Sequence, residues 1–111
     1  TVPTIQKEPF PDLILGNNDR KTAENTLIEL TLKKLKNSGL AVYDNYPFKG
    51  GYITRSKGKV DSNIHALQLE MAKDLYMSND ELDYDNYKAN EVKKWLKNTF
   101  KSLINYLNEG V

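Results

Sequence analysis

The 111-residue chain has no cysteine, a single histidine and no long apolar run. Without cysteine it forms neither disulfide bonds nor thiolate metal sites, which fits a reducing compartment, and we expect a cytoplasmic protein. No apolar stretch approaches the roughly 18 residues that a membrane-spanning helix needs. The formal net charge is +1. Because nucleic-acid binders are usually strongly basic, we expect neither a nucleic-acid nor a membrane partner.

Several catalytic motifs are also missing. The sequence contains no G-x-S-x-G elbow, no P-loop and no dinucleotide-binding fingerprint. A catalytic zinc takes about three protein ligands, usually His, Asp or Glu. With one histidine and neither an H-x-x-E nor an H-x-H pair, this chain alone does not supply such a set. The acidic residues at 80–85 lack the spacing and glycine of a calcium loop, so we interpret them as a solvated connector.

What is present fits an ordinary globular protein. Hydrophobic residues make up 39% and charged residues 28% of the chain, and the length favours one domain over residues 1–111. Since Thr1 replaces an initiator methionine, we expect a processed or excised chain. Apolar periodicity and turn residues predict strands at 13–15 and 40–43, helices at 20–38 and 86–108, and a loop at 49–63. The strand–helix–strand order predicts a parallel pair of strands.

The most informative stretch lies between residues 45 and 70. Asn45-Tyr-Pro-Phe-Lys-Gly-Gly-Tyr-Ile-Thr-Arg55 is followed by Ile64-His-Ala-Leu-Gln-Leu-Glu70. A glycine pair lets a ligand approach the backbone closely, and a guanidinium binds a carboxylate through two hydrogen bonds. A glutamate can serve as base and then acid in amide hydrolysis. From the residues alone, however, a solvated surface position is the commoner role for Glu70.

This stretch resembles the N-formylglutamate amidohydrolases. Their pattern N-x-P-[FY]-x-G-G-[YF]-I-T-R is followed by a basic glycine turn, H-A-L-Q-[LI]-E and a nearby tyrosine, here Tyr76. The resemblance runs from about residue 11 to residue 77 and looks like the C-terminal part of a larger metal hydrolase domain. It implies an α/β fold, a partial three-layer sandwich with a mostly parallel sheet, resembling the C-terminal part of a zinc-carboxypeptidase-like (phosphorylase/hydrolase-like) fold.

The resemblance also implies an activity and roles for single residues. The reaction would be hydrolysis of N-formyl-L-glutamate, a small anionic N-acyl amino acid, to formate and glutamate in histidine catabolism. Zinc is implied, with ligands outside this chain, so no metal ligand is assigned here and we expect no turnover by these 111 residues alone. The implied roles are catalysis by Glu70, substrate binding by Gly50, Gly51, Arg55 and Gln68, and support of the site by Asp12, Asn45 and His65.

Residues 62–77 fit two structures. As a helix, Ser62 would cap the segment, and local propensity mildly prefers this interpretation. As a strand, Leu67 and Leu69 would face one side while Gln68 and Glu70 face the other. The resemblance favours a strand at 64–69 and a helical turn at about 71–77. Glu70 would then stand near the end of a central strand, at the mouth of a site. His65, the one histidine, is either a hydrogen-bonded core residue or a ligand.

A non-catalytic function is the alternative. The apolar positions between Val92 and Leu107 form one helical stripe, which is either a core contact or a face that docks a partner. In the second case the chain would be an α/β interaction module that binds through its C-terminal helix. If the chain is part of a larger enzyme, an exposed sheet edge or this helix would favour self-association.

Overall fold

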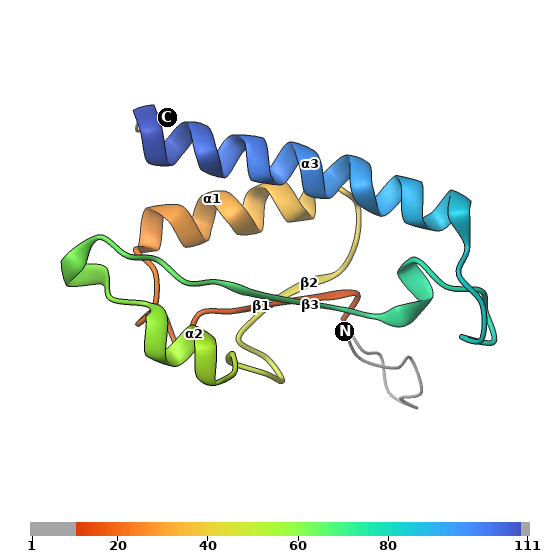
Figure 1. Cartoon of the computed structure of the whole chain (residues 1–111), viewed down its shortest axis with the longest axis horizontal. Helices are drawn as coiled ribbons and strands as arrows, with labels where there is room; N and C mark the ends of the chain where they lie inside the picture. The colour runs from red at the N-terminus through yellow and green to blue at the C-terminus, as the bar shows by residue number, and fades with distance from the viewer. Residues whose placement is uncertain (1–10, 110–111) are drawn as a thin grey trace.

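The computed structural model describes residues 11–109 as a small sheet covered on one face by two helices (Figure 1). The strands are β1 (Leu13–Gly16), β2 (Val42–Asp44) and β3 (Gln68–Met71). The two covering helices are α1 (Asn25–Lys36) and α3 (Asn86–Glu109), and a short helix, α2 (Tyr52–Lys57), lies on the other side of the sheet (Figure 1). Two 3₁₀ turns complete the elements, η1 (Val60–Ser62) and η2 (Lys73–Leu75).

The sheet has the order β2-β1-β3 and is mixed. β1 pairs with β2 in parallel, as the strand–helix–strand order predicted, and with β3 in antiparallel register, with Ile14 opposite Glu70 and Gly16 opposite Gln68. The α/β class is therefore confirmed, but the described sheet is not mostly parallel. The connection from β2 begins at the end of the sheet where β1 and β2 finish. β3 also starts at this end, so it must run back along β1.

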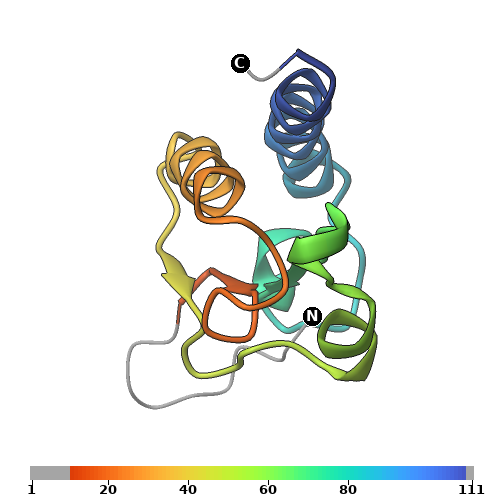
Figure 2. The same cartoon turned by 90° about the vertical axis from the view of Figure 1, so that its left-hand side faces the viewer.

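The core lies between the sheet and the helix pair. Leu13 and Leu15 of β1 pack against Leu27, Ile28, Leu32 and Leu35 of α1, and all six side chains are buried. Ile14, which points to the other face, is buried as well, so the strand predicted at 13–15 is confirmed and is buried on both faces. Figure 2 shows α1 on the β2 side of the sheet and α3 on the β3 side. The hydroxyl of Tyr106 near the end of α3 donates a hydrogen bond to Glu24, and this contact raises the pKa of Tyr106.

Helix α1 begins five residues later than predicted. Asn18, Asp19 and Arg20 all have positive φ values of 49–68°, and a helix cannot form through such left-handed backbone. The predicted start at residue 20 is therefore wrong, and Glu24 is the N-cap residue. Its backbone N–H donates to Nδ1 of His65, 3.1 Å away. At the other end, Gly39 has a φ of 84°, the left-handed conformation that favours glycine after a helix.

Two further segments differ from the prediction. Residues 49–63 are not mostly loop, because they contain α2 and η1. The ambiguous segment forms a strand, as the resemblance favoured, but it spans 68–71 rather than 64–69, and the turn that follows is η2. The C-terminal helix is confirmed with nearly the expected bounds. Within residues 11–109, none of the helices combines the length and apolar character needed to span a bilayer.

The packing between sheet and α1 gives a direct test of the core. Ile28 is fully buried in it, and we expect Ile28→Ala to lower the free energy of unfolding by about 2–5 kcal/mol, because the lost methyl groups leave a cavity. Ile53 on α2 is 74% exposed, so Ile53→Ala is the matched control and should change stability by less than about 0.5 kcal/mol. Urea denaturation followed by circular dichroism measures both; equal effects would contradict this core.

Candidate functional site

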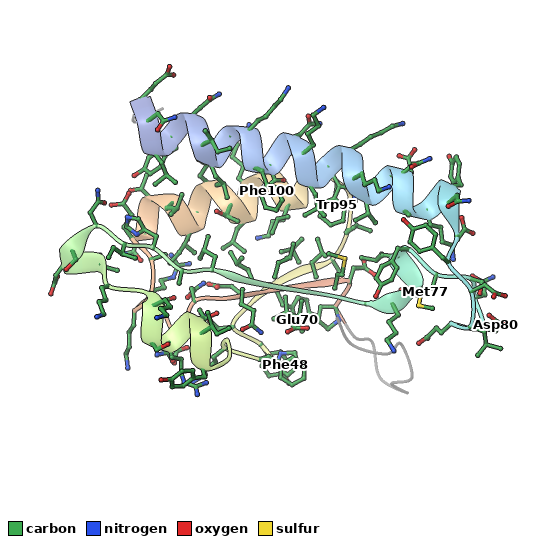
Figure 3. The ribbon with its side chains drawn as sticks, viewed as in Figure 1. Phe48, Glu70, Met77, Asp80, Trp95 and Phe100 are labelled. Carbon is green, nitrogen blue, oxygen red and sulfur yellow. The ribbon has the colours of Figure 1, made fainter. Side chains whose placement is uncertain are left out.

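The alternation of side chains along β3 creates the candidate site. Leu69 and Met71 pack against the core under the helices, so Gln68 and Glu70 point to the opposite face of the sheet. Figure 3 shows Glu70 directed toward Phe48 on that face, while Trp95 and Phe100 lie on the helix side. The strand interpretation of this segment therefore gives the two polar side chains a common direction.

An open pocket of about 480 Å³ lies in front of Gln68 and Glu70. Its other wall is the loop that follows β2, namely Pro47, Phe48, Lys49, Gly50 and Gly51. The loop crosses close to β1: a Cβ atom on Gly16 would stand 2.8 Å from the backbone nitrogen of Gly50. Gly50 itself has a φ of 113°, a conformation that side chains disfavour. Glycine at these two positions lets the loop pass over the sheet at this distance.

Gln68 joins the loop to Glu70. Its Oε1 accepts hydrogen bonds from the backbone N–H of Gly51 at 2.6 Å and from the Thr54 hydroxyl at 3.2 Å. With Oε1 used in this way, Nε2 faces the other direction and donates to Oε1 of Glu70 at 2.8 Å. The amide therefore fixes the distance between the glycine pair and the carboxylate.

Arg55 lies beside the pocket rather than in its lining. It is exposed on α2, and its Nη1 donates to the carbonyl oxygen of Gly50 at 2.9 Å. This bond uses one of the five N–H donors of the guanidinium. The cation is thus attached to the same loop as the glycine pair, at the rim of the pocket.

Asn45 anchors the start of the pocket loop. It has a φ of 60°, and its side chain forms two bonds with Asn17: Oδ1 accepts from the backbone N–H, and Nδ2 donates to the side-chain Oδ1. Asn17 is fully buried directly after β1 and also donates to Asp44 at 2.7 Å. Because these bonds connect the ends of the two parallel strands, they fix the point where the pocket loop leaves the sheet.

Charged pairs surround this anchor. Arg20 contacts Glu29 at 2.6 Å and Asp44 at 3.1 Å. The hydrogen bond to Glu29, with a smaller contribution from Asp44, raises the pKa of Arg20 above its ordinary value. Lys49 of the pocket loop pairs with Asp19 at 2.8 Å. All of these groups are partly exposed, so the pairs orient the loop more than they stabilise the fold.

Two residues that the resemblance assigned to site support lie outside the pocket lining. Asp12 precedes β1 at the end of the sheet opposite the pocket loop, where its carboxylate accepts from the N–H of Ala41 at 2.9 Å. His65 uses Nδ1 to accept from Glu24, and its Nε2 lies 3.0 Å from Asn63. With both ring nitrogens engaged, His65 has the hydrogen-bonded structural role that was one of its two predicted roles.

Glu70 was expected near the end of a central strand; it is near the end of β3, but β3 is not central in the described sheet. It is the third residue of β3, which is an edge strand of the described sheet. Gln68 lies opposite Gly16, the last residue of β1, and is therefore the residue of β3 beside the carboxyl end of β1. The reversal of β3 causes this difference, because it places the first residue of β3, not the last, beside the ends of the parallel strands.

The described residues do not fit a resident zinc ion. Residues 11–109 contain no group of three or more His, Cys, Asp or Glu side chains placed to hold a metal. At the pocket, Glu70 is the one side chain of these four types in the lining. A site of the usual three protein ligands therefore cannot be built from this part of the chain.

Sequence reasoning missed two residues that shape the site. Thr54 is buried and completes the Gln68 contact. It would have been found had the segment after the glycine pair been recognised as a helix, because Thr54, the third residue of that helix, turns back toward the glycine pair. Asn17 follows the predicted strand at 13–15, but its partner Asn45 lies 28 residues away, so no local signal shows the contact.

The Asn17 anchor leads to a testable expectation. In Asn17→Ala the groups on Asp44 and Asn45 lose a buried partner, and we expect a loss of about 1–3 kcal/mol in the free energy of unfolding. The matched control is Asn105→Ala on the exposed side of α3, which should leave stability nearly unchanged. Chemical denaturation measures both variants. An unchanged midpoint for Asn17→Ala would show that these hydrogen bonds are dispensable.

Comparisons with known proteins show which family the chain resembles. The sequence profile of the N-formylglutamate amidohydrolase family matches residues 1–77. The N-formylglutamate deformylase of Pseudomonas aeruginosa is 35% identical over 77 residues, which cover 68% of this chain and 29% of that protein. The N-formylglutamate deformylase of Pseudomonas putida is 31% identical over 105 residues, or 93% of this chain and 39% of that protein.

A solved structure has the same fold over nearly the whole chain. The crystal structure of N-formylglutamate amidohydrolase from Ralstonia eutropha JMP134 superposes with a TM-score of 0.79 at 26% identity, covering 96% of this chain and 38% of that one. The chain thus spans between 29% and 39% of the length of these relatives. Since the family profile covers more than half of its residues, the chain belongs to the N-formylglutamate amidohydrolase family.

Proposed function

We propose that this chain supplies the catalytic base and part of the substrate-binding surface of an enzyme that hydrolyses N-formyl-L-glutamate to formate and glutamate. The observation that carries the proposal is the bridge from the glycine pair through Gln68 to Glu70. It joins four of the motif residues, namely Gly50, Gly51, Gln68 and Glu70, in one pocket. The relatives named N-formylglutamate deformylase support this function over a non-catalytic interaction module.

Glu70 has the chemistry that amide hydrolysis needs. As water adds to the formyl carbon, the carboxylate takes a proton from it; when the C–N bond breaks, the same proton passes to the leaving nitrogen. The products are then formate and the free amine of glutamate. Gln68 keeps the carboxylate in place through its Nε2 donor. A second carboxylate is not required, because one group performs both transfers in turn.

Arg55 and the glycine pair would hold the substrate. The substrate is anionic, and a guanidinium at the pocket rim can bind one of its carboxylates through two parallel hydrogen bonds. The contact with Gly50 keeps Arg55 close to the loop that lines the pocket. Gly51 lacks a side chain where a Cβ atom would stand 3.3 Å from Oε1 of Gln68, which leaves the loop backbone accessible to a ligand.

We also propose that the enzyme uses zinc and has a zinc-carboxypeptidase-like architecture. If the enzyme uses zinc, its ligands come from outside the described residues, and its chemistry would be to polarise the formyl carbonyl. The roles proposed for Glu70, Gln68 and Arg55 involve only side chains of this chain. We likewise expect the 111 residues to need the remaining part of an amidohydrolase for turnover.

The role of Glu70 is best tested in a chimera. This chain would replace the matching part of the Pseudomonas putida deformylase, and formate release from N-formyl-L-glutamate would be measured. We expect Glu70→Gln to lower kcat by about 10²–10⁴, because the amide cannot accept the proton. Glu91→Gln, on the exposed side of α3, is the control and should leave kcat unchanged. Near-normal turnover of the Glu70 variant would exclude it as the base.

Arg55 is tested by a change that keeps its charge. Lysine cannot form the two parallel bonds of a guanidinium, so Arg55→Lys in the same chimera should raise KM by roughly tenfold, the equivalent of 1.4 kcal/mol of binding, while kcat changes less. Steady-state kinetics at several substrate concentrations separate the two constants. Lys57→Arg on the same helix is the control. Unchanged KM for the Arg55 variant would rule out two-bond recognition of the carboxylate.

A further inference from the structure

The substrate of the proposed function, N-formyl-L-glutamate, carries two carboxylates, and Arg55 can hold only one of them through two parallel hydrogen bonds. Glu70 and Gln68, which line the same pocket, carry no positive charge. An anion that leaves water for a pocket needs a cation or hydrogen-bond donors in exchange. A second positive group in the pocket would therefore match the second carboxylate.

Lys49 is the positively charged residue among the described residues that line the pocket. It directly precedes Gly50, whose carbonyl accepts from Arg55 at 2.9 Å, so both cations are attached to the same pocket loop. The backbone of Lys49 is held in place, because its carbonyl accepts from the N–H of Asn18 at 2.8 Å. Its side chain is exposed. Lys49 thus joins a fixed backbone position at the pocket to an ammonium on a flexible stem of four carbons.

The partner that Lys49 has within the chain is a weak one. Its ammonium pairs with Asp19 at 2.8 Å, and the two side chains are 59% and 50% exposed. Exposed pairs of this kind contribute little to stability, because water solvates both groups when they separate. An ammonium also carries three N–H donors. Lys49 can therefore turn from Asp19 to a ligand carboxylate at small cost.

We propose that Lys49 binds the second carboxylate of the substrate and thereby makes the pocket selective for N-formylated amino acids with two carboxylates. This inference rests on the proposed function and adds a specificity-determining residue to it. Arg55 holds one carboxylate at the rim, Lys49 holds the other at the loop wall, and Glu70 faces the pocket from β3. A substrate with a neutral amide in place of one carboxylate leaves one of the two cations without its partner, and a site built for a polar group rejects such an analogue.

A general attraction between an anion and the basic segment would have a different signature. Long-range attraction depends on the summed charge, to which Lys57 and Lys59 contribute in the same way as Lys49. It weakens to a similar degree whichever carboxylate of the substrate is neutralised. A direct contact with Lys49 depends on one carboxylate alone, and it is lost completely when that carboxylate becomes an amide.

The chimera with the Pseudomonas putida deformylase allows a direct test. Lys49→Gln removes the ammonium and keeps most of the stem. We expect it to raise KM for N-formyl-L-glutamate by roughly tenfold, the effect of losing one hydrogen bond to a charged group, while kcat changes less. Lys57→Gln makes the same change of charge on an exposed residue outside the lining, and it should leave KM nearly unchanged.

Two analogues with one amide each locate the contact. N-formyl-L-glutamine lacks the side-chain carboxylate and N-formyl-L-isoglutamine lacks the main-chain carboxylate, and the affinity of each is measured as its inhibition constant against N-formyl-L-glutamate. Lys49→Gln should weaken binding of one analogue by roughly tenfold and leave the other unchanged, which identifies the carboxylate that Lys49 holds.

The same measurements can overturn the inference. Equal weakening of both analogues, or an unchanged KM for N-formyl-L-glutamate in Lys49→Gln, would show that Lys49 makes no direct contact with the substrate. The Glu70→Gln variant checks the proposed function separately. If that variant loses turnover while Lys49→Gln leaves KM unchanged, the proposed function stands and the role of Lys49 is excluded.

Discussion

The side-chain amide of Gln68 is the contact on which the candidate site depends. Its oxygen accepts from Gly51 and Thr54, and its nitrogen donates to Glu70. No rotation of this amide preserves both sets of bonds, since donor and acceptor would exchange places. The loop, the short helix α2 and the carboxylate therefore have one relative arrangement. The glycine pair matters because it lets the loop backbone come close enough to β1 and β3 to make these bonds.

Several elements could be predicted because local signals agreed with the tertiary structure. The strand at Leu13–Gly16 follows from a short continuous apolar run before a glycine, and the C-terminal helix from an apolar stripe at helical spacing, so the type and approximate bounds of both followed from the sequence. The segment at 62–77 has mixed signals. Its residues favour a helix locally, and pairing with β1 decides for a strand. Tertiary hydrogen bonds overrode propensity there, and the resemblance, not the periodicity, anticipated that outcome.

The errors in the predicted elements also arise from backbone conformations and tertiary contacts that the local sequence does not reveal. The start of α1 was placed too early because three successive left-handed residues, 18–20, are unusual for side-chain-bearing residues, and no periodic pattern signals them. The direction of β3 depends on where a 23-residue connection crosses the sheet, which local sequence does not encode. Gly50, Gly51, Gln68 and Glu70 were singled out because they lie in the motif. Thr54 lies in the same motif but was given no role, because its contact with Gln68, like those of Asn17, appears only in three dimensions.

Glu24, the N-cap residue of α1, contacts two segments outside its own helix. Its backbone N–H bonds His65, and its carboxylate accepts from Tyr106. One residue thus fastens the entry of α1, the segment that leads into β3 and the penultimate turn of α3. The last turns of α3 are thus connected through Glu24 to the imidazole three positions ahead of Gln68. The end of α3 is in this way linked, through Glu24 and His65, to the segment that leads into the pocket strand β3.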